Sequence, residues 1–301
     1  MELQQAGYDV VIVDNLSNSR EDVLDGIEKI TGIRPAFEKV DLRDFDATES
    51  VFKKYPKISG IIHFAASKAV GESVQKPLLY YHNNIVSLIN LLQLMPKYDV
   101  KGIIFSSSCT VYGQPDVLPA TEETPIKKAE SPYGNTKQIN EEIIADTIKS
   151  GSPIKAILLR YFNPIGAHPT AFIGEMPNGV PQNLIPYLTQ TAMGIRKELS
   201  VFGDDYDTPD GSCIRDYIYV VDLAKAHVCA MTRIMEDQTT EPVEVYNIGT
   251  GTGTSVLELI NAFEKATGVK LNYKIVGRRA GDIEKVWGNV DLSLIHIWRC
   301  R

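Results

Sequence analysis

Cysteine and surplus positive charge are both scarce in this sequence. Its 301 residues include four cysteines, at positions 109, 213, 229 and 300, and no two of them form a CxxC pair. This usage is typical of reduced thiols in a cytoplasmic protein and not of a disulfide framework. The 31 Lys and Arg residues are outnumbered by 38 Asp and Glu residues, which gives a formal net charge of -7. Such a chain has no excess of cations for a phosphate backbone, so we expect no nucleic-acid partner.

Long apolar runs and metal-ligand patterns are missing as well. No stretch approaches the ~20 apolar residues that a membrane helix requires, and no basic segment followed by an apolar one opens the chain. We therefore expect a cytoplasmic protein with no membrane partner. The histidines at 63, 82, 168 and 227 form neither an HxH nor an HExxH pattern, so we expect no metal ion.

Apolar, β-branched runs alternate with helical patterns in the first half of the chain. Strands buried on both faces are expected at 10–13, 60–66, 102–105 and 154–159. Amphipathic helices are expected at 78–95 and 133–149. This alternation predicts an α/β fold with a doubly wound parallel sheet of the Rossmann type.

The pattern loosens after Arg160, where proline and glycine become frequent. Helices are expected near 184–194, 220–236 and 255–267, with short strands at 199–202 and 245–248 between them. We expect this part to form a smaller α/β lobe over the ends of the strands.

Both ends of the chain look unlike the ends of a complete fold of this type. Residues 2–6 resemble the second half of a helix that Gly7 caps, and the next strand runs into Asp14. In a dinucleotide-binding βαβ unit the acidic residue follows the first glycine of the phosphate turn by ~20 residues. Asp14 suits that role, so we expect the first strand and the glycine-rich turn to lie upstream of Met1. Residues 292–301 look like a translated sequencing adapter, and we expect them to be a non-native tail.

A serine cluster and a YxxxK pattern are the features that indicate chemistry. Ser106, Ser107 and Ser108 end an expected strand, and Tyr133 and Lys137 lie four residues apart at the start of an expected helix, hence on one helix face. A free phenol has a pKa near 10, and an adjacent ammonium, helped by a bound nicotinamide cation, favours the phenolate, which can act as a general base. An isolated YxxxK is mostly a chance match or a packing feature. The buried strand that leads into the serines favours the catalytic interpretation here.

Five segments together resemble a known family. They are 106–113, 131–137, 160–168, 201–211 and 215–223. The chain from about residue 3 to residue 291 is similar to the extended short-chain dehydrogenase/reductase family, and within it to the UDP-galactose (UDP-glucose) 4-epimerases. The resemblance implies an NAD-binding domain at 1–162, whose first strand and glycine-rich loop are missing, and a nucleotide-sugar-binding lobe at 163–291.

The same resemblance implies an activity. Such an isomerase of galactose metabolism interconverts UDP-galactose and UDP-glucose: C4 is oxidised to a 4-keto sugar with NAD and is then reduced on the opposite face. It also implies a homodimer. A chain without the phosphate turn is expected to fold poorly, to bind NAD weakly and to be inactive itself.

The resemblance further implies roles for particular residues. The expected catalytic residues are Ser108, Tyr133 and Lys137. NAD contacts are expected at Asp14, Asn15, Asn18, Ser19, Asp41, Leu42, Phe64, Ala65, Ala66, Lys68, Asn83, Tyr133, Lys137, Tyr161 and Phe162. Contacts with the UDP-hexose substrate are expected at Lys68, Ser108, Tyr133, Asn163, Asn183, Leu184, Phe202, Arg215, Arg279 and Asp282.

Some of these assignments also make physical sense by themselves. Asp14 would accept ribose hydroxyls and repel the extra phosphate of NADP, although an aspartate at a strand end is as often only a turn former. Arg215 and Arg279 suit a diphosphate because a guanidinium pairs phosphate oxygens bidentately. Arginines so far apart in a sequence are more often separate surface residues, so this expectation requires the fold to bring them together.

Three alternatives stay open at this point. A sugar-nucleotide 4,6-dehydratase of the same fold would need an acidic pair after Ser108, where this chain has Cys109 and Thr110. A non-catalytic NAD-sensing protein is possible because a fold does not determine a function, but the intact Ser108, Tyr133 and Lys137 argue against it. An epimerase of UDP-N-acetylhexosamines is the third, since Val286 lies where the family has a residue lining the sugar pocket and a small side chain there leaves room for an N-acetyl group.

Overall fold

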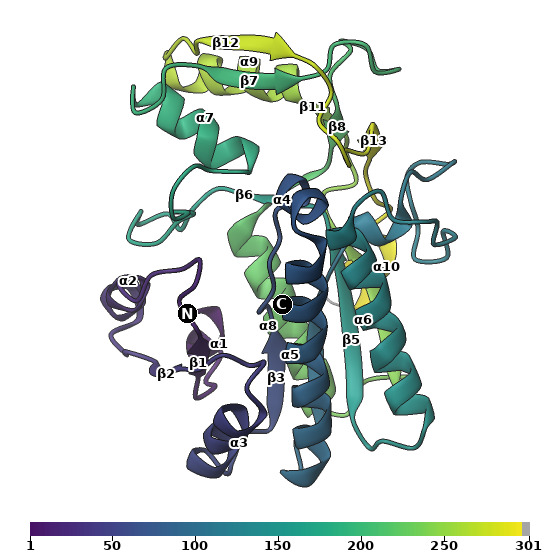
Figure 1. Ribbon diagram of the computed structural model, residues 1–301. Helices are drawn as coiled ribbons and strands as arrows, with labels where there is room; N and C mark the ends of the chain where they lie inside the picture. Colours follow the sequence, from purple (N-terminus) through teal and green to yellow (C-terminus); the bar gives the residue numbers. More distant parts are fainter. Residues whose placement is uncertain (297–301) are drawn as a thin grey trace.

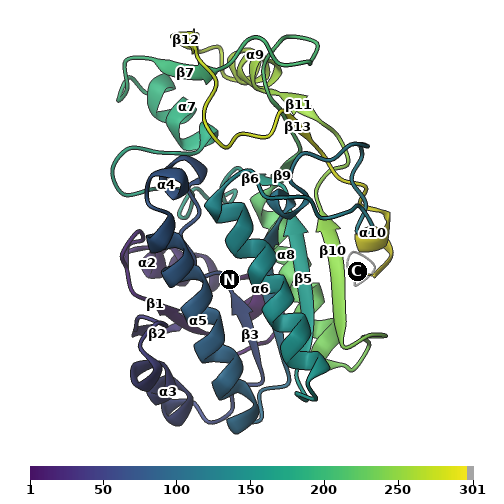
Figure 2. The ribbon, with the colours of Figure 1, turned by 45° about the vertical axis from the view of Figure 1, so that its right-hand side comes forward.

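The central sheet has four parallel strands in the spatial order β10-β5-β4-β3 (Figures 1 and 2). The computed structural model describes residues 1–296. The strands are β3 (Gly60–His63), β4 (Gly102–Ser108), β5 (Lys155–Tyr161) and β10 (Val243–Ile248). The predicted parallel α/β sheet is therefore confirmed.

Helices cover both faces of this sheet because residues of the buried strands alternate between two apolar layers. Helices α5 (Pro77–Lys97) and α6 (Pro132–Lys149) cover one face, and α8 (Val220–Met235) covers the other (Figure 2). Ile103 and Phe105 of β4 pack in the cluster under α5 and α6, whereas Ile104 packs in the cluster under α8. The strand is apolar at consecutive positions because each of its faces packs against a separate hydrophobic cluster.

The N-terminal segment forms a second small sheet beside β3. Strand β1 (Val11–Asp14) pairs in parallel with β2 (Ala36–Lys39), and among the described residues neither pairs with β3. The helices of this segment are α1 (Glu2–Gln5), α2 (Val23–Thr31) and α3 (Phe45–Lys54). Gly7 follows α1 with a φ of 87°, in agreement with the expected glycine cap.

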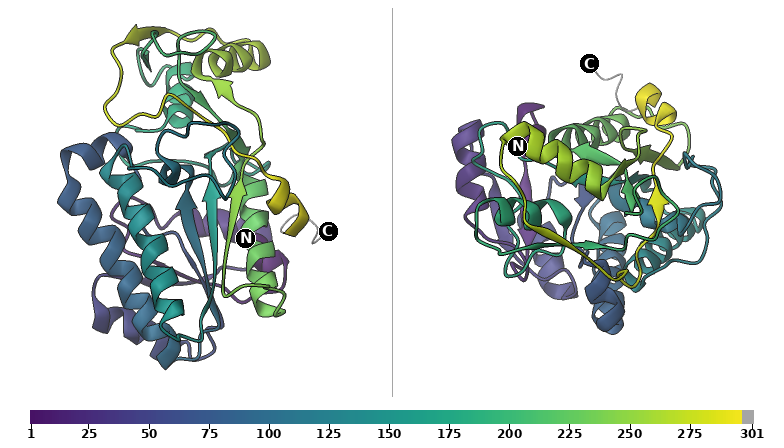
Figure 3. Two further views of the ribbon diagram at one scale, coloured as in Figure 1. Left: turned by 90° about the vertical axis from the view of Figure 1, so that its right-hand side faces the viewer. Right: turned by 90° about the horizontal axis from the view of Figure 1, so that it is seen from above.

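A lobe of short strands stands over the carboxyl ends of the central sheet (Figure 3). Its strand pairs are β6 (Asn163–Ile165) with β9 (Tyr217–Tyr219), β7 (Leu199–Phe202) with β12 (Tyr273–Val276), and β8 (Ile214–Arg215) with both β11 (Thr254–Ser255) and β13 (Lys285–Val286). Helices α7 (Leu184–Ala192) and α9 (Val256–Thr267) pack against β7. The two parts are not divided at residue 162 alone, because α8 and β10, which follow that residue, return from the upper lobe to the central sheet.

Three short helices complete the described chain. They are α4 (Val70–Gln75), the 3-10 turn η1 (Cys109–Tyr112) and α10 (Asp291–His296). The expected non-native tail begins within α10, and its residues 297–301, with Cys300, lie outside the described part. Over residues 1–296 no helix combines the length and the apolarity that crossing a membrane would take.

Candidate active site

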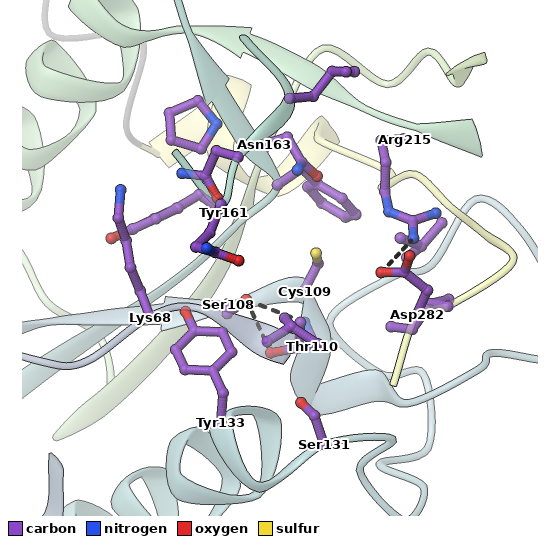
Figure 4. A pocket seen from close by; sticks show the side chains of 18 of the residues that line it. Lys68, Ser108, Cys109, Thr110, Ser131, Tyr133, Tyr161, Asn163, Arg215 and Asp282 are labelled. Carbon is purple, nitrogen blue, oxygen red and sulfur yellow. Dashed lines mark hydrogen bonds and ion pairs between the residues drawn. The ribbon is translucent and has the colours of Figure 1, made fainter. Parts of the chain in front are cut away.

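A cavity of about 420 Å³ lies where β4 and β5 end beneath the upper lobe. Its floor includes Ser108 of β4 and Tyr133 of α6, and its far wall carries Arg215 and Asp282 (Figure 4). Crevices at the carboxyl ends of parallel strands are where α/β sheets bind ligands. The position agrees with that rule.

The start of α6 places Tyr133. Ser131 caps the helix by accepting a hydrogen bond from the Gly134 N–H at 3.2 Å, and Pro132 occupies the first helical position. The Tyr133 phenol therefore lies in the first turn, where its hydroxyl points toward Ser108 (Figure 4). The Ser108 hydroxyl also accepts hydrogen bonds from the Thr110 N–H at 3.2 Å and from the Thr110 hydroxyl at 3.0 Å.

Lys137 lies one turn further along the same face of α6. Its Nζ is 5.9 Å from the centre of the Tyr133 ring and 4.9 Å from that of Phe105, and it donates a hydrogen bond to the Ser106 carbonyl. The Ser106 hydroxyl contacts the Tyr161 hydroxyl from the other side. The expected grouping of the serine cluster with Tyr133 and Lys137 is thus present in the geometry.

Burial dominates the electrostatics of this group. Burial raises the pKa of Tyr133, the Tyr161 phenol adds to the rise, and the hydrogen bond with Ser108 opposes it. Burial also lowers the pKa of Lys137 to about 8, while Glu141 opposes that change. The adjacent ammonium is expected to favour the phenolate with the help of a bound nicotinamide cation, and in the protein itself desolvation of the phenol is the largest effect on its pKa. Within the protein itself, Tyr133 is held as a neutral phenol.

The fold brings the two expected arginines together. Arg279 donates to both oxygens of Asp282, from Nε at 3.0 Å and from Nη2 at 2.6 Å. Nη2 of Arg215 lies 3.9 Å from the same Asp282 carboxylate. Arg279 also stacks over Phe202, with 5.5 Å between its guanidinium carbon and the ring centre. Two cations thus meet at one wall of the cavity, where an anionic group can compete for them.

Glu175 is a cavity residue that the sequence argument missed. Its carboxylate accepts a hydrogen bond from the Asn183 side chain at 2.8 Å and pairs with the Lys68 ammonium at 3.2 Å. The residue lies in the irregular stretch after β6, where no periodicity indicates which side chains face inward.

A smaller cavity of about 60 Å³ opens at the ends of β1 and β2. One Asp14 oxygen accepts hydrogen bonds from the Leu16 N–H at 2.6 Å and the Ser19 hydroxyl at 2.8 Å, and among the described residues the other oxygen has no partner. Asp41 is held by Arg43, whose hydrogen bonds lower the pKa of that carboxyl. The Asp14 oxygen suits a ribose hydroxyl, so these residues fit the adenosine half of a dinucleotide.

The expected site residues divide between the two cavities. The larger one is lined by Phe64, Lys68, Ser108, Tyr133, Lys137, Tyr161, Phe162, Asn163, Asn183, Leu184, Arg215, Arg279 and Asp282. The smaller one is lined by Asp14, Asn15, Asn18, Asp41, Leu42, Ala65, Ala66 and Asn83. Ser19 and Phe202 line neither, but each contacts a residue that does, Asp14 and Arg279 respectively. No three His, Cys, Asp or Glu side chains gather as a metal site would require in residues 1–296.

Known proteins resemble this chain over nearly all its length. Residues 1–249 match the NAD dependent epimerase/dehydratase family. UDP-glucose 4-epimerase 2 of Arabidopsis thaliana is 51% identical over 97% of this chain and 83% of its own. A UDP-glucose 4-epimerase from Bifidobacterium longum, solved with NAD+ and UDP, has a TM-score of 0.95 and 48% identity over 99% of this chain and 87% of its own. The enzyme from Stenotrophomonas maltophila, solved with NAD and formylated UDP-arabinopyranose, has a TM-score of 0.92 and 45% identity over the same shares.

Proposed function

Because the chain belongs to the NAD dependent epimerase/dehydratase family, we propose that it is a UDP-glucose 4-epimerase, which interconverts UDP-glucose and UDP-galactose with NAD as cofactor. One observation carries this assignment. Tyr133, Ser108 and Lys137 lie on one side of the cavity. Arg215 and Arg279, which share the Asp282 carboxylate, lie on the other side. A proton-transfer group and a diphosphate clamp therefore face each other across a space large enough for a nucleotide sugar.

The chain's own residues supply positioning and proton transfer. Tyr133 takes the proton of the C4 hydroxyl, and Ser108 holds the C4 oxygen through a hydrogen bond. When bound, NAD supplies the hydride chemistry and a positively charged ring. Loss of the hydroxyl proton to Tyr133 and of the C4 hydrogen as hydride, which NAD would accept, leaves a 4-keto sugar. Return of the hydride to the opposite face of C4, with return of the proton from Tyr133 to the oxygen, inverts C4. Arg215 and Arg279 hold the diphosphate while the hexose turns.

The charge balance explains why Tyr133 acts only in the complete site. Burial keeps its phenol neutral in the protein alone, and Lys137 is charged only below about pH 8, where its pKa lies. A second positive charge beside the phenol lowers the energy of the phenolate. Proton transfer is thus coupled to the bound cofactor.

The residues that would hold NAD span both cavities. Asp14 and its neighbours at the ends of β1 and β2 would bind the adenosine half, and Tyr133, Lys137 and Tyr161 would surround the nicotinamide.

We also propose that the protein is cytoplasmic and forms a homodimer. Sedimentation of the purified chain tests the oligomeric state.

A second substrate class is favoured by one residue. Val286 of β13 lines the larger cavity beside Cys109, and its side chain is small. We propose that the site also accepts UDP-N-acetylhexosamines, because Val286 leaves space that a tyrosine would fill. Parallel assays with UDP-galactose and UDP-N-acetylgalactosamine test this, with Val286→Tyr expected to reduce turnover of the second substrate only.

The decisive experiment uses NAD-loaded protein and UDP-galactose without any added reductant. Appearance of UDP-glucose supports the proposal. A 4-keto-6-deoxy product would instead identify a dehydratase. Tight binding of NAD and UDP-sugar with no conversion would favour the non-catalytic NAD-sensing protein.

A further inference from the structure

A buried carboxylate continues the catalytic face of α6. Tyr133, Lys137 and Glu141 follow one another at intervals of four residues, so all three side chains project from the same side of the helix. Glu141 is only 6% exposed. The proposed chemistry uses the first two side chains and gives no reason for a charge at the third.

Glu141 is bound by two strands at once. Arg160 of β5 donates to it from Nε at 3.0 and 3.2 Å and from Nη2 at 2.6 Å, and the Ser107 hydroxyl of β4 donates a further hydrogen bond. Ser107 and Arg160 are direct partners in the pairing of β4 with β5. The carboxylate therefore fixes α6 against both strands, one turn beyond Lys137.

The alternation of β4 separates the roles of its three terminal serines. Ser106 and Ser108 line the cavity, whereas Ser107 lies between them on the opposite face, toward Glu141. The Ser106 carbonyl receives the Lys137 ammonium. The contact between Glu141 and Ser107 therefore fixes the position of α6 along β4. This position determines how Lys137 and Tyr133 lie relative to Ser106 and Ser108.

The charges around Lys137 are few. Burial lowers its pKa to about 8, and Glu141 is the negative group that acts against this change. The other titratable groups of the surrounding elements are Tyr133, 5.9 Å from the ammonium at its ring centre, His63 of β3, Tyr161 at Ser106, Arg160 at Glu141, and Tyr80 of α5 near Tyr133. The pKa of His63 falls to about 3, through burial and then through Lys137, and burial raises the pKa values of all three phenols. These four groups are neutral near pH 7, and Arg160 is paired with Glu141.

We propose that Glu141 is a positioning residue of the active site, which holds Lys137 at Ser106 and supplies the negative charge that keeps this buried ammonium protonated. The inference rests on the proposed role of Lys137 beside Tyr133. Glu141 does not reach the cavity, so it acts on the reaction only through Lys137 and Ser107.

A buried ion pair could instead serve the fold alone, and the chain offers a matched control for that. Arg233 of α8 donates to Glu244 of β10 at 2.7 and 2.9 Å, and their side chains are 9% and 6% exposed. The pair of Arg160 and Glu141 is equally buried, with 7% exposure for each side chain. Loss of either carboxylate leaves a buried guanidinium unpaired and destabilises the protein. Only one of the two pairs adjoins Lys137.

The test is an NMR titration of the full chain labelled with ¹³C at the lysine Cε. The Lys137 signal is identified by its loss in Lys137→Met. In Glu141→Gln we expect its titration midpoint to fall by about one pH unit, because the opposite charge is gone. In Glu244→Gln we expect the midpoint to stay at the wild-type value. An unchanged midpoint in Glu141→Gln, or an equal fall in both variants, overturns the proposal.

A second variant covers the case in which Glu141→Gln does not fold. Glu141→Gln combined with Arg160→Met removes both charges and leaves no buried ion unpaired, which proteins often tolerate. The Lys137 midpoint should again fall, and an unchanged value counts against the proposal. This readout needs no turnover. If the midpoint falls while Lys137→Met leaves epimerisation intact, the proposed role of Lys137 fails and the coupling to Glu141 stands.

Discussion

At the scale of single residues, the site depends on a phenol that its surroundings keep neutral. The Tyr133 hydroxyl points toward Ser108, and burial raises its pKa. A tyrosine in this state does not remove a proton by itself at neutral pH. It becomes a base only when positive charge lies close to it. Removal of its hydroxyl should therefore affect the chemical step and leave the binding of the nucleotide sugar largely unchanged.

We expect Tyr133→Phe to lower kcat by about 10²- to 10⁴-fold, the usual contribution of a positioned acid or base. KM for UDP-galactose should change little. The measurement is a coupled assay normalised to bound NAD. The control is Tyr81→Phe, whose hydroxyl accepts a hydrogen bond from Asn135 at 2.7 Å outside the cavity. Near wild-type kcat in Tyr133→Phe would reject the proposed mechanism.

Two adjacent arginines allow the diphosphate clamp to be tested. Arg279 pairs with Asp282 at the wall of the cavity, whereas Arg278 stacks on Tyr206 and pairs with Asp205 outside it. Arg279→Ala should raise KM for UDP-galactose by about 10- to 100-fold with a smaller change in kcat, because charge-assisted hydrogen bonds are lost. Arg278→Ala should leave KM unchanged. Equal KM values for the two variants would exclude Arg279 from substrate binding.

Some site residues could be predicted from the sequence and others could not, for a physical reason. Tyr133, Lys137 and Glu141 share a helical spacing, so the third could have been found by extending the pattern of the first two. Glu175 belongs to an irregular stretch between β6 and α7, where the direction of a side chain depends on tertiary contacts. The shift in the Tyr133 pKa could not be predicted either, because it follows from burial and not from spacing.

At the scale of elements, periodicity located the strands of the central sheet and the long helices that cover it, but not which strands pair with each other. The strand expected at 60–66 ends at His63, because the next residues leave the sheet to line the cavities. Strand β4 continues from its apolar run at 102–105 through the serine cluster to Ser108, as expected, and its three serines are buried although they are polar. The pairing of β10 with β5 joins residues more than 80 positions apart, and local sequence carries no signal for it.

The first turn of α6 is the element on which the catalytic geometry depends. Ser131 caps it, and a cap is worth about 1 kcal/mol of stability. Ser131→Ala should lower both the free energy of unfolding and kcat, since the fraying turn carries Tyr133. Ser255→Ala removes a comparable cap from α9, where Ser255 and Glu258 form a capping box, and should lower stability alone. Thermal melts with kcat on the same samples test this, and equal losses of kcat would contradict it.

At the scale of the whole molecule, the residues expected to contact ligands lie around two cavities, which adjoin two separate sheets. The expected UDP-sugar contacts, except Phe202, line the larger cavity between the central sheet and the upper lobe. The expected NAD contacts, except Ser19, are divided between that cavity and the smaller one at the ends of β1 and β2. Among the described residues β1 pairs only with β2, and β3 only with β4. The two groups of expected NAD contacts are thus joined, within the described residues, by the packing of α3 on α5 and of α1 on α8 and not by a continuous sheet.

This division predicts how two ligands change the thermal stability of the 301-residue chain. A ligand raises Tm according to its affinity for the folded state, and affinity falls when binding must also order separate parts of a site. UDP needs only the larger cavity, so we expect saturating UDP to raise Tm by several degrees. NAD must bind residues of both cavities at once and so fix their relative position. We therefore expect saturating NAD to raise Tm less than UDP does. Arg279→Ala should abolish the UDP shift and spare the NAD shift, and Asp14→Ala should do the reverse. A single cooperative transition that NAD shifts as far as UDP does would show that the β1–β2 pair is already fixed against β3.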